Sequence, residues 1–400
     1  MPLISLTDAR AMISRAVSPL EPIVMPLAEA HGRVLREDVL APEDLPAFDR
    51  SAMDGYAVAA GDDSARFRIV AELQAGHASE VELHAGECAR IFTGAQIPRG
   101  ATQVVMQEDV DRDGEWMIPR RRDAKTWIRR RGEDARRGDL LLAAGCRLRA
   151  GELSLLAQLG AVRPHVSPAP RVVHFVTGNE LVDPSTQPGP GQIRDSNSIL
   201  VRALLAEAGA QLAKQGHCGD DLAALVAVLA EQPAESWDML LVSGGASVGD
   251  YDFGTRALEE IGFAIHFRQI NLRPGKPLVF ATRGRQVAFV IPGNPVSHFV
   301  TFHAAIRLAL ECLEGGPQSW PLAPVELDAD LPMKPDPREM WWPAHVTAVE
   351  GVWRAHPLSW QSSGDLRGLV SANALIPIPP GTGAIPSGAS FRALLLNAQL

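Results

Sequence analysis

The chain has 400 residues, of which 46% are hydrophobic and 21% charged, and its formal net charge is −9. A single core rarely grows beyond about 250–300 residues, so we expect two or more domains. The acidic balance argues against a general nucleic-acid-binding protein, and the four cysteines have no C-x-x-C spacing that would indicate a zinc knuckle.

No basic and then apolar leader opens the sequence, and we find no run of the roughly 18 apolar residues that a membrane helix needs. We therefore expect a cytoplasmic protein that binds neither membrane nor nucleic acid. No repeat of fixed period is found, which argues against a solenoid.

Within the first 168 residues the sequence pattern changes from one typical of helix to one typical of short strands and turns. Ser5 and Asp8 stand at capping-box spacing before apolar residues at helical intervals, which predicts a packing helix. From residue 46 to 137, short apolar runs alternate with turns, which predicts an inserted β-rich module. We assign residues 1–45 and 138–168 to a mixed, partly helical linker or packing domain.

A basic cluster lies inside that module, between residues 120 and 137. In an acidic protein such a cluster could attract a phosphorylated substrate. Runs of charge are more often solvated faces, so both interpretations are kept.

After a proline-rich joint, apolar runs alternate with helical patterns as far as residue 316. This alternation predicts an α/β domain, residues 169–316, whose mostly parallel sheet is covered on both faces. Glu180 and Asp220 would then lie at C-terminal strand ends, where open sheets bind their ligands.

Residues 317–400 have short strands and many prolines, which predict a small C-terminal β domain similar to a barrel. We expect its tryptophans, Trp341, Trp342, Trp353 and Trp360, to pack in a core or at a dimer interface rather than to form a ligand cage. The predicted fold class is therefore multidomain, α/β plus β.

An apolar run at 239–242 ends in the segment Ser-Gly-Gly-Ala-Ser-Val-Gly-Asp-Tyr-Asp at 243–252, which a helical pattern follows. A buried strand, a glycine turn and a helix N-terminus together favour an anion. Gly244 and Gly245 lack a Cβ, so their backbone can adopt positive φ and approach a ligand closely. The segment matches neither the P-loop nor the G-x-G-x-x-G pattern.

Asp250 and Asp252 would repel a phosphate bound at this turn. The helix dipole favours an anion by about 0.3–1 kcal/mol, whereas each like charge at about 4 Å costs about 4 kcal/mol at an intermediate dielectric. A divalent cation would have to lie between them, and we expect Mg²⁺, which prefers few carboxylates together with phosphate oxygens.

Two further turns follow in the same domain. The sequence Arg-Pro-Gly-Lys-Pro at 273–277 holds two cations between prolines that restrict the backbone. An apolar run then leads to Asn294 as N-cap and Pro295 at the first helical position, which predicts a second helix N-terminus suited to an anion. Each turn alone is ordinary, but together they predict a phosphate-binding site.

The segments 243–252, 273–277 and 292–297 resemble, in this order, the three signature blocks of the MoeA family of molybdopterin molybdenumtransferases, which includes the gephyrin E domain. Blocks at 45–58 and 362–377 extend the resemblance over nearly the whole chain. The resemblance implies that the central α/β domain is similar to the MoaB and Mog proteins.

This resemblance implies an enzyme of molybdenum cofactor biosynthesis, a molybdopterin molybdotransferase. Such an enzyme takes adenylylated molybdopterin, inserts molybdate, and releases AMP in the presence of Mg²⁺. The resemblance also implies an elongated homodimer with a shared active site, an upstream adenylyltransferase and downstream molybdoenzyme chaperones as partners.

The resemblance also implies roles for individual residues. Asp220, Asp250 and Asp252 would hold or orient Mg²⁺ and water. The catalytic set would be Glu180 as acid or base, Asp220, Asp252 and Lys276, with Asp54 and Thr93 reaching in from the β-rich module. The molybdopterin, phosphate or oxyanion would be bound by Ser243, Gly244, Gly245, Ser247, Gly249, Arg273, Pro292, Gly293, Asn294 and Ser363.

Three positions depart from the family pattern. Asn179 stands where aspartate is usual, Gln269 lies near a usual lysine that Arg268 could replace by adjacency, and Pro343 lies near a usual arginine. These departures leave open a molybdopterin-binding carrier or scaffold that has lost turnover. A nucleotide pyrophosphatase on the same domain is a third hypothesis.

Overall fold

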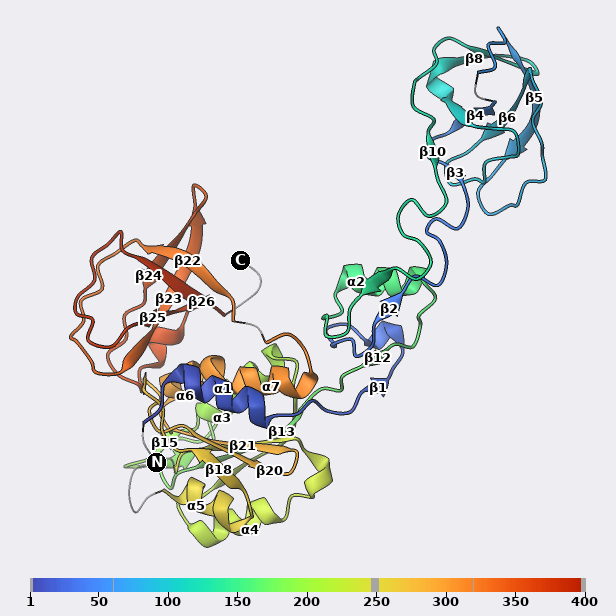
Figure 1. Ribbon diagram of the computed structural model, residues 1–400. Coiled ribbons are helices and arrows are strands. Elements are labelled where there is room, and N and C mark those ends of the chain that lie inside the picture. Colours follow the sequence, from blue (N-terminus) through green and yellow to red (C-terminus); the bar gives the residue numbers. More distant parts are fainter. Residues whose placement is uncertain (1–2, 60, 246–251, 319, 397–400) are drawn as a thin grey trace. The chain divides into compact units, whose positions relative to one another are not determined.

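The computed structural model of the chain describes residues 3–59, 61–245, 252–318 and 320–396. The chain divides into two compact units (Figure 1). The first comprises Met1–Arg36, Gly145–Leu153 and Val162–Leu400, and the second comprises Glu37–Ala144 and Ser154–Ala161. The predicted domain boundaries are finer than this division and stay predictions.

The first unit is built on a six-stranded sheet in the order β16-β13-β17-β21-β20-β18. Strands β16, β13, β17 and β21 run parallel, and β20 pairs antiparallel with β21 because only two residues connect them. The prediction of a mostly parallel sheet is therefore confirmed. The strands are β13 (Arg171–Thr177), β16 (Gln211–Cys218), β17 (Met239–Ser243), β18 (Ala264–Phe267), β20 (Val279–Arg283) and β21 (Gln286–Ile291).

Helices cover both faces of this sheet (Figure 1). Alternate strand residues point to opposite faces, so Leu241 packs in one core and its neighbour Leu240 in the other. The first face is covered by α1 (Leu6–Ala16), α3 (Asn197–Glu207), α6 (Pro295–Thr301), the π-helical turn η4 (Phe302–Ile306) and α7 (Arg307–Glu314). The second face is covered by α4 (Leu222–Ala230) and α5 (Phe253–Glu260).

Local signals set where the first helix begins. The Ser5 hydroxyl accepts the backbone N–H of Asp8 at 3.0 Å, as the capping-box spacing predicts. Leu6, Ala9 and Ile13 are buried on one side of α1. The predicted packing role of this helix is thus confirmed.

One expectation needs correction. The continuous helical segment Pro295–Glu314 has 20 residues and is long and apolar enough to cross a membrane by length and composition, although we expected no such run. Its apolar window is 89% buried inside the fold. Core packing therefore accounts for its apolar character.

A small barrel follows the α/β sheet in the first unit. Pairing runs β23-β24-β22-β26-β25, and β25 pairs back with β23, so five strands close on themselves. The predicted C-terminal β domain is confirmed, and β19 (Leu272–Arg273) of the preceding domain adds in parallel to β23. The strands are β22 (Leu322–Leu327), β23 (Glu339–Val349), β24 (Val352–Pro357), β25 (Ala374–Ile378) and β26 (Ser390–Leu395).

The second unit contains the predicted β-rich module, a six-stranded sheet in the order β7-β4-β6-β5-β9-β8. Its strands are β4 (Gly55–Val58), β5 (Phe67–Leu73), β6 (Glu87–Ile91), β7 (Gln103–Met106), β8 (Val110–Asp113) and β9 (Trp116–Pro119). Short pairs join β3 (Arg50–Ser51) to β10 (Ile128–Arg129) and β2 (Val39–Leu40) to β11 (Leu140–Leu142).

The remaining elements are short. The helix α2 (Ala150–Gln158) lies within residues 138–168, which we predicted to be partly helical. In the first unit β1 (Ile23–Val24) pairs with β12 (His165–Val166), and β14 (Leu181–Val182) pairs with β15 (Ile193–Arg194). Single 3₁₀ turns are η1 (Leu27–Glu29), η2 (Gln107–Asp109), η3 (Ala234–Ser236) and η5 (Leu366–Leu369).

Candidate active site

The C-terminal ends of the four parallel strands meet at one edge of the α/β sheet, where such sheets bind ligands. Strand β13 leads to Asn179 and Glu180, β16 to Asp220, β17 to the Gly244 turn, and β21 to the Pro292 turn. The structure thus places four segments that the sequence analysis singled out along a single edge.

The glycine turn after β17 requires its glycines. Gly244 has φ of +93°, and a Cβ there would lie 2.5 Å from Oγ1 of Thr177. Gly245 has φ of +62°, and its Cβ would lie 3.0 Å from the backbone nitrogen of Gly254 in α5. A Cβ on Gly293 would lie 3.9 Å from Cα of Gly244. The start of α5, the glycine turn and the Pro292 turn are therefore neighbours.

The Pro292 turn ends at the N-cap of α6, as predicted. Asn294 has extended backbone and Pro295 is the first helical residue. The Asn294 side chain does not cap the helix, because its amide donates to Oγ of Ser363 at 2.8 Å. The Ser363 carbonyl accepts the N–H of Val296 at 3.0 Å. Ser363, a predicted ligand-binding residue, thus lies against the turn.

A cavity of about 690 Å³ opens between the α/β domain and the barrel of the first unit. Its lining includes Arg273 and Lys276 of the α/β domain and Lys334 and Arg338 of the barrel domain. Four cations on one cavity would favour a polyanionic ligand. The lining also includes Pro292, Asn294, Ser297, Trp342, Trp360, Gln361, Ser362 and Ser363.

A single carboxylate joins two of these cations. Asp336, whose side chain is 8% exposed, accepts from Nη1 of Arg273 at 2.5 Å and from Nε of Arg338 at 3.0 Å. Hydrogen bonds from Arg338 and Arg273 hold the pKa of Asp336 well below its usual range. The barrel therefore fixes the side chain of Arg273.

The acidic residues at the sheet edge are not among the described residues that line that cavity. The N–H of Asn179 donates to Oδ2 of Asp220 at 3.3 Å, and the N–H of Asp220 donates to Oδ1 of Asn179 at 3.2 Å. Asn179 therefore holds the two loops together. Glu180 is exposed, and its Oε2 lies 2.8 Å from where a Cβ on Gly178 would be.

Asp252 is the N-cap of α5. Its Oδ1 accepts from the hydroxyl of Thr255 at 2.5 Å, and its Oδ2 lies 3.6 Å from Nη1 of Arg268. Arg268, which we considered as a substitute for the usual lysine, therefore faces Asp252 and also pairs with Glu259 at 2.6 Å. The predicted site residues Ser247, Gly249 and Asp250 lie outside the described residues.

Asp54 and Thr93 form a fixed pair within the second unit. The backbone N–H and the hydroxyl of Thr93 each donate to Oδ1 of Asp54 at 2.7 Å. These two hydrogen bonds hold the pKa of Asp54 below its usual range.

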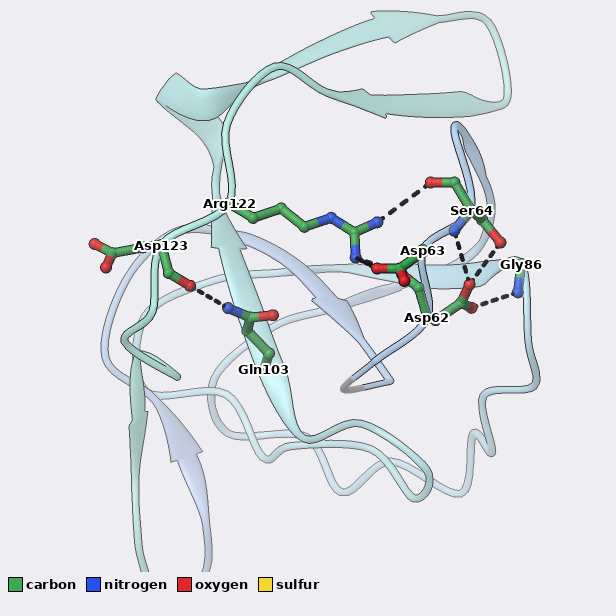
Figure 2. Close-up of polar contacts among 7 residues, drawn as sticks. All are labelled: Asp62, Asp63, Ser64, Gly86, Gln103, Arg122 and Asp123. Atoms are coloured by element: carbon green, nitrogen blue, oxygen red, sulfur yellow. Dashed lines mark hydrogen bonds and ion pairs between the residues drawn. The ribbon is translucent and has the colours of Figure 1, made fainter.

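Much of the basic cluster has structural partners in the same unit. Arg122 donates to the carbonyl oxygen of Ser64 at 3.2 Å and pairs with Asp63 at 3.9 Å; both contacts are drawn in Figure 2. The carboxylate of Asp62 in the same loop accepts the N–H of Gly86 at 2.7 Å (Figure 2). Other pairs join Arg129 to Glu133, Arg130 to Asp49 and Arg131 to Asp44. These contacts favour the structural interpretation of the cluster.

Sequence reasoning missed what the barrel contributes. Lys334, Asp336 and Arg338 carried no motif, although three charges at alternate positions before a strand were a weak signal. The tryptophans pack against the hydrophobic cores, as expected. Trp342 and Trp360 also line the cavity, with ring centroids 5.4 Å apart.

Comparisons with known proteins cover nearly all of this structure. Three family models match: the MoeA N-terminal region (domain I and II) at residues 4–160, a probable molybdopterin binding domain at 174–311, and the MoeA C-terminal region (domain IV) at 325–396. The molybdopterin molybdenumtransferase of Bacillus subtilis is 35% identical over 387 residues, which are 93% of this chain and 89% of that protein.

Two further relatives agree with these matches. A molybdopterin molybdenumtransferase of Nostoc sp. is 33% identical over 414 residues, covering 99% of this chain and 94% of that protein. The crystal structure of the molybdopterin biosynthesis moeA protein from Pyrococcus horikoshii superposes with a TM-score of 0.83 at 27% identity, covering 98% of this chain and 100% of that one. The chain is a member of the MoeA family.

Proposed function

We propose that this protein is a molybdopterin molybdenumtransferase of molybdenum cofactor biosynthesis, which inserts molybdate into adenylylated molybdopterin and releases AMP. The observation that supports it most is the meeting of two backbone turns with a cavity lined by four cations, in a chain whose relatives bear that name. In the reaction, water adds to the phosphoanhydride, one phosphate leaves on AMP, and the other stays on the pterin.

Different residues of the first unit would have different roles in this reaction. The Gly244 turn and the Pro292 turn would present backbone N–H donors to the phosphate or oxyanion. Arg273 and Lys276 would neutralise the charge that develops on the phosphoanhydride. Glu180, exposed at the sheet edge, would transfer the proton of the attacking water.

Magnesium fits this site only together with its substrate. The described residues contain no group of three His, Cys, Asp or Glu side chains able to hold a metal. Mg²⁺ is commonly held by one or two carboxylates plus substrate phosphates, so Asp220 and Asp252 would suffice once the phosphoanhydride is bound. Bound Mg²⁺ would supply neutralisation of phosphate charge. Mg²⁺ affinity should therefore depend on the nucleotide.

The direct test combines purified protein, adenylylated molybdopterin, molybdate and Mg²⁺, and follows AMP release and reconstitution of a molybdoenzyme. Both should appear, and both should require molybdate. Tight binding of molybdopterin without AMP formation would instead indicate a carrier, the hypothesis motivated by Asn179, Gln269 and Pro343. Cleavage of ADP-ribose without molybdate would indicate a nucleotide pyrophosphatase.

We further propose a homodimer in which Asp54 and Thr93 serve the site of the other subunit. Mixed dimers of an Asp54→Asn chain and an Asp252→Asn chain test this arrangement, because each variant alone should be inactive. Partial recovery of AMP release on mixing supports a shared site, and no recovery in confirmed mixed dimers contradicts it. An upstream adenylyltransferase and downstream molybdoenzyme chaperones are the proposed partners.

A further inference from the structure

Three buried polar side chains form a continuous series of hydrogen bonds next to the Gly244 turn and the Pro292 turn, which we call the two anion turns. His174 of β13, Ser243 of β17 and His298 of α6 are 0%, 0% and 1% exposed. Oγ of Ser243 lies 2.7 Å from Nε2 of His174 and 2.7 Å from Nε2 of His298. Two imidazole rings are therefore linked through one hydroxyl.

The hydrogen bonds of Gln215 determine which ring nitrogen of His174 carries the proton. The amide nitrogen of Gln215 lies 2.9 Å from Nδ1 of His174 and also donates to the carbonyl of Ser198 at 2.9 Å, while Oε1 of Gln215 accepts from Arg202 at 2.8 Å. These partners set the orientation of the amide, so Nδ1 of His174 must accept. His174 then carries its proton on Nε2 and donates to Ser243.

The opposite end of the chain fixes the second ring. The carbonyl oxygen of Asn294 can only accept, and it lies 3.1 Å from Nδ1 of His298. His298 therefore carries its proton on Nδ1, and its Nε2 accepts from the Ser243 hydroxyl. Each N–H or O–H in this series therefore has one acceptor, and the donor-to-acceptor direction is the same at every hydrogen bond from Gln215 to the carbonyl of Asn294.

Both rings are neutral at neutral pH. Burial lowers the pKa of His174 to about 3 and that of His298 to about 4. A serine between two histidines resembles an activated nucleophile, but Ser243 is fully buried, so substrate cannot reach it. The chain must act through the backbone that it joins.

That backbone belongs to both anion turns. Ser243 immediately precedes Gly244, whose N–H donates to the carbonyl of Ile291 at 2.9 Å. Asn294, at the other end of the chain, is the N-cap of α6 and lines the cavity. The amide of Asn197 also donates to the carbonyl of Gly293 at 2.7 Å.

We infer that His174, Ser243 and His298 are positioning residues, whose ordered hydrogen bonds hold the Gly244 turn and the Pro292 turn at the spacing needed to contact one anionic group. The inference rests on the proposed function for what the turns bind. The order of the hydrogen bonds and their effect on the turns do not depend on it.

The proton order has a spectroscopic test in the intact protein. With ¹⁵N-labelled histidine, long-range proton–nitrogen spectra should show His174 protonated on Nε2 and His298 on Nδ1. Both assignments come from comparison with the single histidine variants. The opposite tautomer at either ring would overturn the inference.

The effect on the turns is tested with Ser243→Ala, which leaves two buried ring nitrogens unpaired. Hydrogen exchange of peptides covering residues 286–298 should become faster, and kcat/KM for AMP release should fall by about tenfold to a hundredfold, since small misplacements of binding groups cost that much. Unchanged exchange and unchanged kcat/KM would each overturn the inference.

A triple variant separates positioning from stability. In His174→Leu, Ser243→Ala, His298→Leu, the buried ring nitrogens are gone and only the half-buried amide N–H of Gln215 loses an acceptor, so the unfolding midpoint should recover relative to Ser243→Ala. Activity should stay low, because nothing then ties the turns. Recovery of activity together with stability would show that the chain only packs, and would overturn the inference.

His303 offers a matched control on the same helical segment. It is 5% exposed, and neither ring nitrogen has a hydrogen-bond partner among the described residues. His303→Leu should leave kcat/KM and the exchange of residues 286–298 unchanged, whereas a loss equal to that of Ser243→Ala would overturn the inference. If the wild-type protein releases no AMP, the proposed function fails, and the tautomer and exchange results still decide this inference.

Discussion

Nη1 of Arg273 lies 2.5 Å from Oδ2 of Asp336, a residue 63 positions further along the chain. Arg273 belongs to the basic turn of the α/β domain, and Asp336 precedes the first long strand of the barrel. The cation that we expect to meet the substrate phosphate is thus oriented by the neighbouring domain of the same unit. Two domains therefore build one cation cluster.

Asp336→Asn should separate binding from turnover. Removing a negative charge from a cavity with four cations strengthens the field on an anion, so the KM for the nucleotide substrate should fall or stay unchanged. The kcat should fall because Arg273 is no longer held, and the unfolding free energy should drop by about 1–3 kcal/mol as hydrogen bonds to a nearly buried carboxylate are lost. Steady-state kinetics and urea unfolding measure these quantities.

The matched control is Asp328→Asn in the same barrel. Asp328 pairs with His356 at 2.9 Å in an exposed position, and it is not among the described residues that line the cavity. Its replacement should leave kcat and KM as they are. An Asp336→Asn protein with unchanged kcat would show that Arg273 needs no anchor.

Asp252→Asn should abolish turnover while the protein stays folded. Asparagine caps helices about as well as aspartate, so α5 should keep its N-terminus, and the melting temperature should change little. The loss of the carboxylate should lower AMP release about a hundredfold or more, since metal and phosphate would be misplaced. A folded variant that retains most of its activity would exclude Asp252 from the metal site.

Asp221→Asn is the equivalent change one helix away. Asp221 is the N-cap of α4 and accepts the N–H of Ala224 at 2.7 Å. The same chemical substitution there should affect neither stability nor AMP release. The comparison isolates the role of charge at Asp252 from the role of a helix cap.

The sequence predicted the fold because its signals are local. Apolar strand runs, glycine turns and helix-start residues such as Ser5 and Pro295 each act within a few positions. The parallel sheet then followed from strands that alternate with helices. The strand-end rule placed Glu180 and Asp220 at the edge where the structure has them.

The unpredicted part of the site depends on contacts between distant segments. Asp336 meets Arg273 only after the barrel packs on the α/β domain, and no spacing in the sequence reports it. The same holds for Ser243, which lies 69 residues from His174 and 55 from His298. A histidine in an apolar strand reads as an isolated core residue until its partner is known.

Gly244→Ala and Gly293→Ala, one in each of the two neighbouring turns, should differ in their effect on stability. Gly244→Ala forces a side chain into positive φ and places Cβ 2.5 Å from Oγ1 of Thr177, so the backbone strain alone should cost about 1–3 kcal/mol. Gly293 is exposed, and its Cβ would make an ordinary 3.9 Å contact with Gly244. Gly293→Ala should therefore fold with stability changed by less than about 0.5 kcal/mol.

Gly293→Ala then becomes the functional test of the turn. If a phosphate or oxyanion approaches the backbone at this position, the added methyl group should block it, and the affinity for the nucleotide substrate should fall about tenfold or more. Isothermal titration and thermal unfolding on the same sample measure both quantities. Wild-type affinity in this variant would place the anion elsewhere along the sheet edge.

Three buried histidines should make the stability depend on pH. Burial lowers the pKa of His174 to about 3 and that of His298 to about 4, and burial together with the charge of Arg307 lowers the pKa of His303 to about 3. Asp195 acts in the opposite direction on His298 without offsetting its burial. The folded protein therefore keeps these rings neutral, while the unfolded chain binds protons below about pH 6.5.

The stability that these rings contribute is complete above about pH 6.5 and is lost as the pH falls toward their folded pKa values. Lowering the pH from 7 to 5 should reduce the unfolding free energy by about 2 kcal/mol for each of these histidines. Urea unfolding of His303→Leu should show a decrease smaller than that of the wild type by about this amount. An equal decrease in both proteins would mean that His303 takes up a proton in the folded state, against the burial that the structure gives it.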